Sequence, residues 1–210
     1  CYILDEPSIG LHPRDNERLI QSLRDLQRLG NTVIVVEHDE ATMREADQII
    51  DVGPGAGQNG GNVVAQGTPT EVQADTASVT GQYLVGEKRI AIPEKRRKVK
   101  ARKQISLERA TTNNLKNVTL KIPLETFVCV TGVSGSGKSS LVNETLARAI
   151  TRHLGNKCPK PGSFSELKGV GHLDKLVQIT QAPIGRTPRS NAATYTGVFD
   201  EIRKVFSQTR

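Results

Sequence analysis

One eight-residue motif restricts the possible fold of this chain more than any other feature. Residues 132–139 read GVSGSGKS and match the phosphate-binding pattern G-x-x-x-x-G-K-[ST]. The apolar run 127–131 before it predicts a buried β-strand, and residues 138 to about 153 predict a helix. A strand, a glycine-rich loop and a helix in this order form a P-loop, and this context argues against a chance Gly/Ser turn.

The P-loop motif assigns chemistry to each of its residues. Its glycines let successive backbone N–H groups point at phosphates, and the helix N-terminus adds partial positive charge. We expect Lys138 to reach the β- and γ-phosphates and the Ser139 hydroxyl to bind Mg²⁺. The expected nucleotide-binding residues of this motif are Gly132, Val133, Ser134, Gly135, Ser136, Gly137, Lys138, Ser139 and Ser140.

An acidic pair follows the first apolar strand, residues 2–4. Asp5 and Glu6 in this position have the arrangement of a Walker B motif. In that motif the first acid holds Mg²⁺, directly or through water, and the second orients the attacking water or takes its proton. Taken alone, the pair is equally compatible with ordinary surface acids in a loop. The segment 8–11, SIGL, follows at once and favours the Walker B interpretation.

Polar residues also end two other predicted strands. His38 comes soon after the β-branched run 32–36, where a sensor of the γ-phosphate belongs, although a single His is more often structural. Gln181 ends a strand predicted over 176–180 and is a candidate to touch Mg²⁺ and the attacking water. Its alternative role is that of a solvated polar cap.

The order of these motifs is unusual. Asp5 precedes Lys138 by 133 residues, whereas in an ordinary P-loop enzyme the phosphate loop comes before the Walker B strand. A single domain with this order needs a permuted fold. The simpler interpretation is the back half of one ATPase followed by the front half of a second, so that neither nucleotide site is complete in this chain.

Positive charge is concentrated between these two halves. The chain has 29 Lys plus Arg and 22 Asp plus Glu, a net charge of +7. Residues 88–103 hold nine basic residues and one acidic residue, a net of +8, so the remainder is close to neutral. Since this stretch lacks any helical or strand period, it predicts an exposed linker. We expect domains over 1–85 and 105–210, joined by a linker over 86–104.

Hydrophobic periodicity predicts an α/β fold with a parallel sheet. In the first half, Leu residues from 19 to 29 predict a helix that stops at Gly30, and the run 32–36 predicts a strand buried on both faces. The other predicted elements are a helix ending near 46, strands over 48–52, 105–110 and 118–122, a turn at 112–114, and a helix over 197–207.

Composition excludes several classes of protein. No apolar run approaches the roughly 18 residues of a membrane span, so a transmembrane protein is excluded. Seven aromatic residues are few for a binder of single strands that relies on base stacking. Cys1, Cys129 and Cys158 lack the spacing of a zinc site or disulfide framework and indicate thiols. Because the chain opens within a strand and without Met, we expect a fragment of a longer protein.

Five segments carry a resemblance to a known family. They read YILDEPSIGLH, VIVVEHD, DVGPGAG, TGVSGSGKSSL and QAPIGRTPRSNAATYTG, and they extend over nearly the whole chain. Together they closely resemble the UvrA family, the damage-sensing component of the ABC excinuclease in bacterial nucleotide excision repair. DEPSIGLH and PIGRTPRSN are far more specific than the P-loop alone. Residues 191–193 read Asn-Ala-Ala, where the family is expected to have Asn-Pro-Ala.

The resemblance implies a fold of the ABC-ATPase type, with two incomplete heads joined by the basic linker. Residues 1–85 are then the end of the first head, and residues 105–210 the start of the second. The implied site residues are Asp5 and Glu6 as Walker B, residues 8–11 as the D-loop, His38 as the switch histidine, residues 132–139 as the second Walker A, and Gln181 as the Q-loop glutamine.

The resemblance also implies cofactors and partners. ATP and Mg²⁺ are the expected cofactors, with zinc held by parts of the intact protein outside these residues. The expected partners are damaged double-stranded DNA, the excinuclease component UvrB and a second copy of the protein, all in the cytoplasm. Clusters of basic residues contact nucleic-acid phosphates. The candidate DNA contacts are therefore Arg186, Arg189, Arg203 and Lys204. Each of them is equally compatible with a solvated surface charge.

The leading hypothesis is a fragment of an ATPase that controls DNA loading and release, inactive by itself. One alternative is a paralogue, or another soluble ABC ATPase, that acts outside the excinuclease. A second is a module that binds nucleotide or DNA without turnover. A third, the ATPase of a membrane exporter, is disfavoured by DEPSIGLH and PIGRTPRSN.

Overall fold

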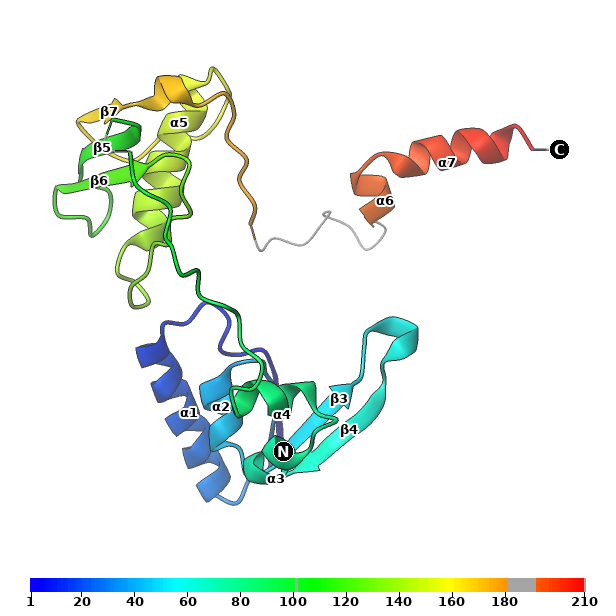
Figure 1. Ribbon diagram of the computed structural model, residues 1–210. Helices are drawn as coiled ribbons and strands as arrows, with labels where there is room; N and C mark the ends of the chain where they lie inside the picture. Colours follow the sequence, from blue (N-terminus) through cyan, green and yellow to red (C-terminus); the bar gives the residue numbers. More distant parts are fainter. Residues whose placement is uncertain (101, 181–191, 210) are drawn as a thin grey trace. The chain divides into compact units, whose positions relative to one another are not determined.

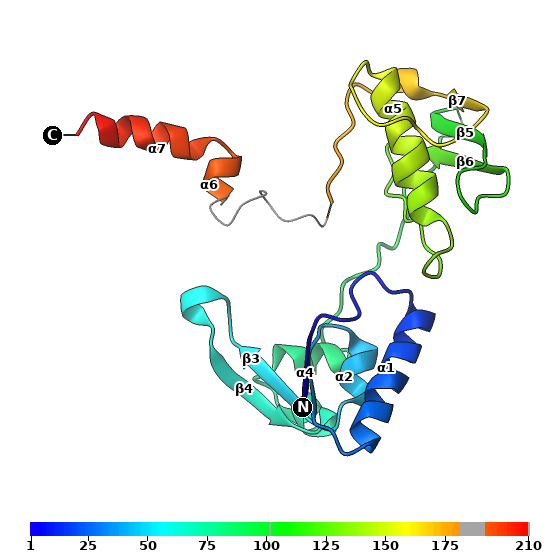
Figure 2. The ribbon, with the colours of Figure 1, turned by 180° about the vertical axis from the view of Figure 1, so that it is seen from behind.

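The computed structural model describes residues 1–100, 102–180 and 192–209 of the 210-residue chain. It has two compact units, Cys1–His172 and Leu173–Arg210. Figures 1 and 2 show the elements of each unit from opposite sides.

The chain begins with a parallel strand pair joined by a helix. Strand β1 (Tyr2–Asp5) pairs with β2 (Val33–Val36), and helix α1 (Pro13–Arg28) connects them. The His12 side chain accepts the Arg14 N–H at the start of α1. After its end, Gly30 has a φ of +84°, a left-handed conformation that suits glycine. These elements confirm the predicted strands, helix and helix stop.

One expectation for β2 is wrong, because its side chains are not buried on both faces. Ile34 is 49% exposed, and Ile3, its register partner on β1, is 75% exposed. Among the described residues this sheet has two strands, and the face that carries these side chains is left largely open to solvent. An apolar strand is buried on both faces only where a layer packs on each of them.

The next elements form a small core around an antiparallel hairpin. Strand β3 (Ile49–Gly53) pairs with β4 (Asn62–Gly67), so β3 is present as predicted but does not join the parallel sheet. Three short helices accompany the hairpin, α2 (Glu40–Glu45), α3 (Pro69–Ala74) and α4 (Val79–Leu84), with a 3₁₀ turn, Gly57–Asn59, at its tip. The buried core residues are Ile49, Ala65, Val72 and Leu84, with Met43 and Ala46 packed against them.

A second sheet supports the glycine-rich loop. Strands β5 (Gln104–Ala110), β6 (Val118–Pro123) and β7 (Glu166–Lys168) are antiparallel in the order β6-β5-β7. The predicted helix from 138 to 153 is present, with a π-helical stretch (Ser140–Ala147) followed by α5 (Arg148–His153). In both views α5 lies beside this sheet (Figures 1 and 2). A 3₁₀ turn (Val170–His172) follows β7.

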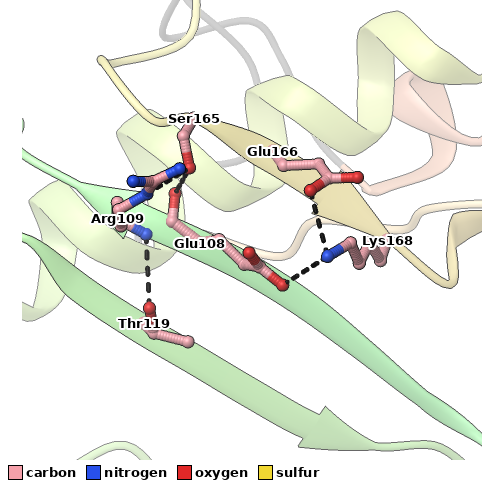
Figure 3. A network of polar contacts seen from close by, with 6 residues as sticks. All are labelled: Glu108, Arg109, Thr119, Ser165, Glu166 and Lys168. Atoms are coloured by element: carbon pink, nitrogen blue, oxygen red, sulfur yellow. Dashed lines mark hydrogen bonds and ion pairs between the residues drawn. The ribbon is translucent and has the colours of Figure 1, made fainter.

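Polar contacts attach β7 to the central strand β5. Lys168 Nζ lies 2.8 Å from Glu108 Oε1 and 3.0 Å from Glu166 Oε2, and the bond to Lys168 holds the pKa of Glu108 below its ordinary value. A bulge in β5 turns Arg109 toward Ser165, with 3.2 Å between Nε and Oγ. Figure 3 shows this network, which consists of Glu108, Arg109, Thr119, Ser165, Glu166 and Lys168.

Two predicted strands are absent. Residues 127–131 and 176–180 form no strand, and their side chains are largely exposed, with Phe127 at 99%. A strand requires a neighbour for its backbone N–H and C=O groups, and no described strand pairs with either segment. High β-propensity alone therefore does not make these segments strands in this chain.

The basic segment has no helix or strand in its described residues between Leu84 and Gln104, and its side chains are exposed. Its end is held by Glu125, which accepts hydrogen bonds from Lys100 and Lys103 at 2.8 and 2.9 Å. These bonds lower the pKa of Glu125 to about 2. The division into domains over 1–85 and 105–210 stays a prediction.

The described residues of the second unit include the helices α6 (Ala192–Tyr195) and α7 (Val198–Ser207). Helix α7 confirms the helix predicted over 197–207. None of the helices in the part of the chain that the structure describes is long and apolar enough to cross a membrane.

We predict that Leu107→Ala lowers the free energy of unfolding by about 3 kcal/mol, because Leu107 in β5 is fully buried and its truncation leaves a cavity. Chemical denaturation measures the change. Ile90→Ala is the control, since Ile90 is 87% exposed and should change stability by less than about 0.5 kcal/mol. Equal effects of the two substitutions would contradict the position of Leu107 in the core.

Candidate nucleotide-binding site

The glycine-rich loop 132–139 leads directly into the helix that begins at Lys138. Gly135 and Gly137 have φ values of +75° and +101°, a left-handed region in which a Cβ is strained. Lys138 Nζ donates to the carbonyl oxygens of Gly132 and Val133 at 2.6 and 2.9 Å. The ammonium group thus folds back over its own loop, where a phosphate group would find a cation and backbone donors together.

The two serines at the start of the helix differ in their surroundings. Ser139 is exposed, and its hydroxyl has no hydrogen-bond partner among the described residues. Ser140 is buried, and its hydroxyl accepts a hydrogen bond from Asn113 Nδ2 at 2.8 Å. The Ser139 hydroxyl is therefore available to a ligand, whereas the Ser140 side chain is already engaged within the protein.

A turn between β5 and β6 braces the loop. Asn114 Nδ2 donates to the Gly135 carbonyl at 2.9 Å, and Asn113 Nδ2 lies 3.1 Å from Glu144 Oε2. Thr112 Oγ1 lies 2.9 Å from Thr145 Oγ1 on the following helix. The sequence predicted this turn but not its contacts, since two adjacent asparagines indicate only a turn.

The acidic pair and His38 meet at the ends of the parallel strands. The register places Asp5 opposite Val36, and the Glu6 N–H donates to the Val36 carbonyl at 2.8 Å. This brings Glu6 Oε1 to 3.3 Å from Nε2 of His38. The structure therefore brings together the predicted Walker B acid and the predicted sensor histidine.

Asp5 and Ser139 are the residues predicted to hold Mg²⁺. The Asp5 side chain is exposed and makes no hydrogen bond with the described residues. Carboxylate and hydroxyl oxygens are hard donors that suit this cation. Both donors thus fit the expected ion in chemistry and availability.

Glu37 is a site residue that sequence reasoning missed. Its carboxylate accepts hydrogen bonds from the Ser8 N–H and hydroxyl, each at 2.8 Å, and from the His38 N–H at 3.1 Å. Partial burial raises the pKa of Glu37, but these bonds outweigh it and hold the pKa below its ordinary value. Glu37 therefore ties the loop that follows the acidic pair to the end of β2.

Asp39 has a similar role two residues later. It accepts hydrogen bonds from Asn16 Nδ2 at 2.7 Å and from the Thr42 N–H at 2.9 Å. Burial raises the pKa of Asp39, and the bonds from Thr42 and Asn16 lower it further than burial raises it. Asp39 thereby caps α2 and holds α1 beside it.

The predicted DNA contacts are only partly described. On α7, Arg203 pairs with Asp200 at 3.3 Å, and Lys204 pairs with Glu201 at 2.7 Å. Arg186, Arg189 and the predicted catalytic Gln181 lie outside the described residues.

All three cysteines are free thiols, with Cys1 and Cys129 exposed and Cys158 half-buried. Among the described residues there is no group of three or more His, Cys, Asp or Glu side chains that could hold a metal ion.

Comparison with solved structures assigns the fold to a class. The chain superimposes on UvrA2 from Deinococcus radiodurans with a TM-score of 0.87 and 45% identity, over 99% of this chain and 24% of that one. The mixed helix-and-strand fold is therefore that of part of an ABC-type ATPase.

The sequence comparisons are more specific, although no family model matches the chain. The chain is 61% identical to UvrABC system protein A of Staphylococcus epidermidis and 62% identical to that of Bacillus subtilis, each over 208 residues and 99% of this chain. This segment is thus similar over nearly its whole length to proteins named UvrABC system protein A, which confirms the resemblance seen in the sequence. It spans 22% of the length of these relatives.

We predict that Glu37→Gln lowers the free energy of unfolding by about 1 kcal/mol at neutral pH, because an amide cannot accept all of these hydrogen bonds. The pKa of Glu37 is lowered in the folded state, so the contribution is complete above the ordinary value of 4.5 and is lost as the pH falls through the lowered pKa. Denaturant titrations across this range measure the difference between parent and variant.

The matched control is Glu87→Gln, because Glu87 is exposed and has no side-chain partner among the described residues. It should leave stability unchanged at every pH. A difference between parent and Glu37→Gln that persists at low pH would contradict the role of the ionised carboxylate.

Proposed function

We propose that the protein carrying this segment is a damage-recognition ATPase of nucleotide excision repair, in which ATP binding and hydrolysis control DNA loading and release. The observation that supports this most directly is the loop 132–139, in which Lys138 and left-handed glycines combine a cation with flexible backbone donors. The high identity to proteins named UvrABC system protein A supports the repair role.

At the loop 132–139, the proposed mechanism begins with phosphate binding. Lys138 exchanges its bonds to the Gly132 and Val133 carbonyls for bonds to phosphate oxygens and neutralises their charge. The Ser139 hydroxyl, which has no hydrogen-bond partner among the described residues, would hold Mg²⁺ together with a Walker B acid. When bound there, Mg²⁺ would supply positive charge that offsets the negative charge developing on the phosphates during transfer.

At the end of β1, Glu6 is the proposed catalytic acid–base residue. It orients the attacking water or accepts its proton, and Asp5 holds Mg²⁺. His38, 3.3 Å from the Glu6 carboxylate, positions that carboxylate and responds to the γ-phosphate. Gln181 is proposed to touch Mg²⁺ and the water as the Q-loop residue.

We assign Asp5, Glu6 and His38 to the first ATPase head and the loop 132–139 to the second. Each complete site then needs parts outside this segment, which spans 22% of its relatives. The proposed partners are damaged double-stranded DNA, the excinuclease component UvrB and a second copy of the protein, in the cytoplasm. Zinc is proposed to bind elsewhere in the intact protein, and the proposed DNA contacts are Arg186, Arg189, Arg203 and Lys204.

A second candidate is a paralogue that acts outside the excinuclease. The match to a chain named UvrA2 favours it, although the identity of 45% is lower than the 61–62% to proteins named UvrABC system protein A. A repair assay with damaged DNA and the other excinuclease proteins separates the two candidates.

We predict that Lys138→Ala in the full-length protein slows ATP hydrolysis at this site by about 100-fold, since a phosphate-binding cation is lost, and impairs DNA release. Steady-state ATPase and DNA-dissociation assays measure both effects. Lys157→Ala, at an exposed lysine of the same unit, is the control. Parental activity in Lys138→Ala would overturn the assignment.

We also predict that the purified 210-residue segment has no measurable ATPase activity, because it holds half of each proposed site. Phosphate release in the presence of ATP and Mg²⁺ tests this. Robust turnover by the segment, unchanged in Lys138→Ala, would point to a contaminant; turnover abolished by that substitution would refute the half-site proposal.

A further inference from the structure

The side chain of Asn114 contacts the glycine-rich loop at two points. Its Nδ2 donates to the Gly135 carbonyl at 2.9 Å. Its Oδ1 lies 2.8 Å from the position that a Cβ on Gly137 would occupy. The amide group of Asn114 therefore contacts the residues on both sides of Ser136.

The contact to Gly135 determines where the next backbone N–H points. In a trans peptide the C=O and N–H groups point in opposite directions. The Gly135 carbonyl faces Asn114, so the Ser136 N–H faces the other way, and it donates to the Val133 carbonyl at 3.2 Å. Lys138 Nζ binds the same carbonyl, at 2.9 Å. The Ser136 N–H and the Lys138 ammonium thus converge on one side of the loop.

Two hydrogen bonds hold this orientation, one from the Ser136 N–H to the Val133 carbonyl and one from Asn114 to the Gly135 carbonyl. A phosphate that takes the Ser136 N–H replaces the first, so that only the bond from Asn114 then holds the peptide. Glycine populates positive and negative φ about equally, so without that bond the peptide after Gly135 is free to rotate and turn its carbonyl toward the lysine. A carbonyl oxygen there would repel phosphate, whereas the N–H attracts it. Holding the donor in place before the ligand arrives removes an ordering cost from binding.

The turn that carries Asn114 is itself held on both sides. Asn113 Nδ2 bonds the buried Ser140 hydroxyl, and Thr112 Oγ1 contacts Thr145, which is fully buried. Leu115 lies against Gly137, with Cδ2 3.0 Å from the Cβ position. These contacts join the turn to the first turns of the helix, so Asn114 acts from a fixed base.

We propose that Asn114 is a positioning residue of the nucleotide site, which orients the Gly135–Ser136 peptide so that its N–H faces the bound phosphates. This inference rests on the proposed nucleotide binding at residues 132–139. It adds a residue outside the P-loop motif to the machinery of that site.

The test uses the full-length protein and an acyl-phosphate derivative of ATP that transfers its acyl group to a lysine beside the phosphates. Mass spectrometry measures labelling of Lys138, so the readout is specific to this loop. In Asn114→Ala, we expect the ATP concentration that halves the labelling to rise about 3- to 10-fold, the effect of one lost hydrogen bond. The melting temperature without nucleotide should stay unchanged.

Two further variants sharpen the test. Asn114→Leu keeps the size of the side chain but has no donor, and it should shift the ATP midpoint as Asn114→Ala does. Parental behaviour of Asn114→Leu would mean that packing, not the hydrogen bond, matters, and would overturn the proposal. Asn156→Ala is the control, since Asn156 is exposed and its side chain makes no hydrogen bond among the described residues.

The outcomes separate this inference from the proposed function. If ATP does not compete with labelling of Lys138 in the parent, the proposed nucleotide site fails and the inference fails with it. If ATP competes equally in the parent and in Asn114→Ala, only the inference is overturned. If Asn114→Ala raises the ATP midpoint and also lowers the melting temperature measured without nucleotide, the role of Asn114 is purely structural. That result also overturns the inference.

Discussion

Backbone N–H and C=O groups in a strand need a neighbouring strand, and the presence or absence of such neighbours shapes this whole structure. Where β1 meets β2, the parallel register brings Glu6 to His38. Where β5 meets β6, the turn between them reaches the glycine-rich loop. Where no neighbour is present among the described residues, as at 127–131, an equally apolar segment forms no strand and is exposed.

Around these pairings, charged and amide side chains determine the shape of the loops. Glu37 holds the loop after the acidic pair through the backbone and hydroxyl of Ser8, and Asn114 holds the glycine-rich loop through one carbonyl. In both cases a side chain from one strand end or turn satisfies backbone groups of another segment. Such contacts arrange donors and acceptors before a ligand binds, which is the usual basis of electrostatic preorganisation.

Much of the fold was predictable from local patterns. The helix before Gly30, the helix from 138 and the strands β5 and β6 follow from apolar periodicity and helix-end signals, which depend on neighbours in the sequence. The candidate site was predictable where a motif carries its chemistry, as in the loop 132–139. Glu37, Asn113 and Asn114 were not predictable as site residues, because their contacts join positions more than 20 residues apart and no spacing rule connects them.

The sequence by itself determined the resemblance to the UvrA family, the glycine-rich motif at 132–139, the acidic pair after the first strand, and the concentration of positive charge in one segment. These properties reside in residue types and their order. Only the tertiary structure decided which strands find partners and which side chains brace the loops. It also decided that, among the described residues, the Ser140 hydroxyl has a hydrogen-bond partner and the Ser139 hydroxyl has none. The physical reason is that hydrogen bonding and burial depend on which groups lie near a residue in space. Those groups can belong to residues that are far away in the sequence.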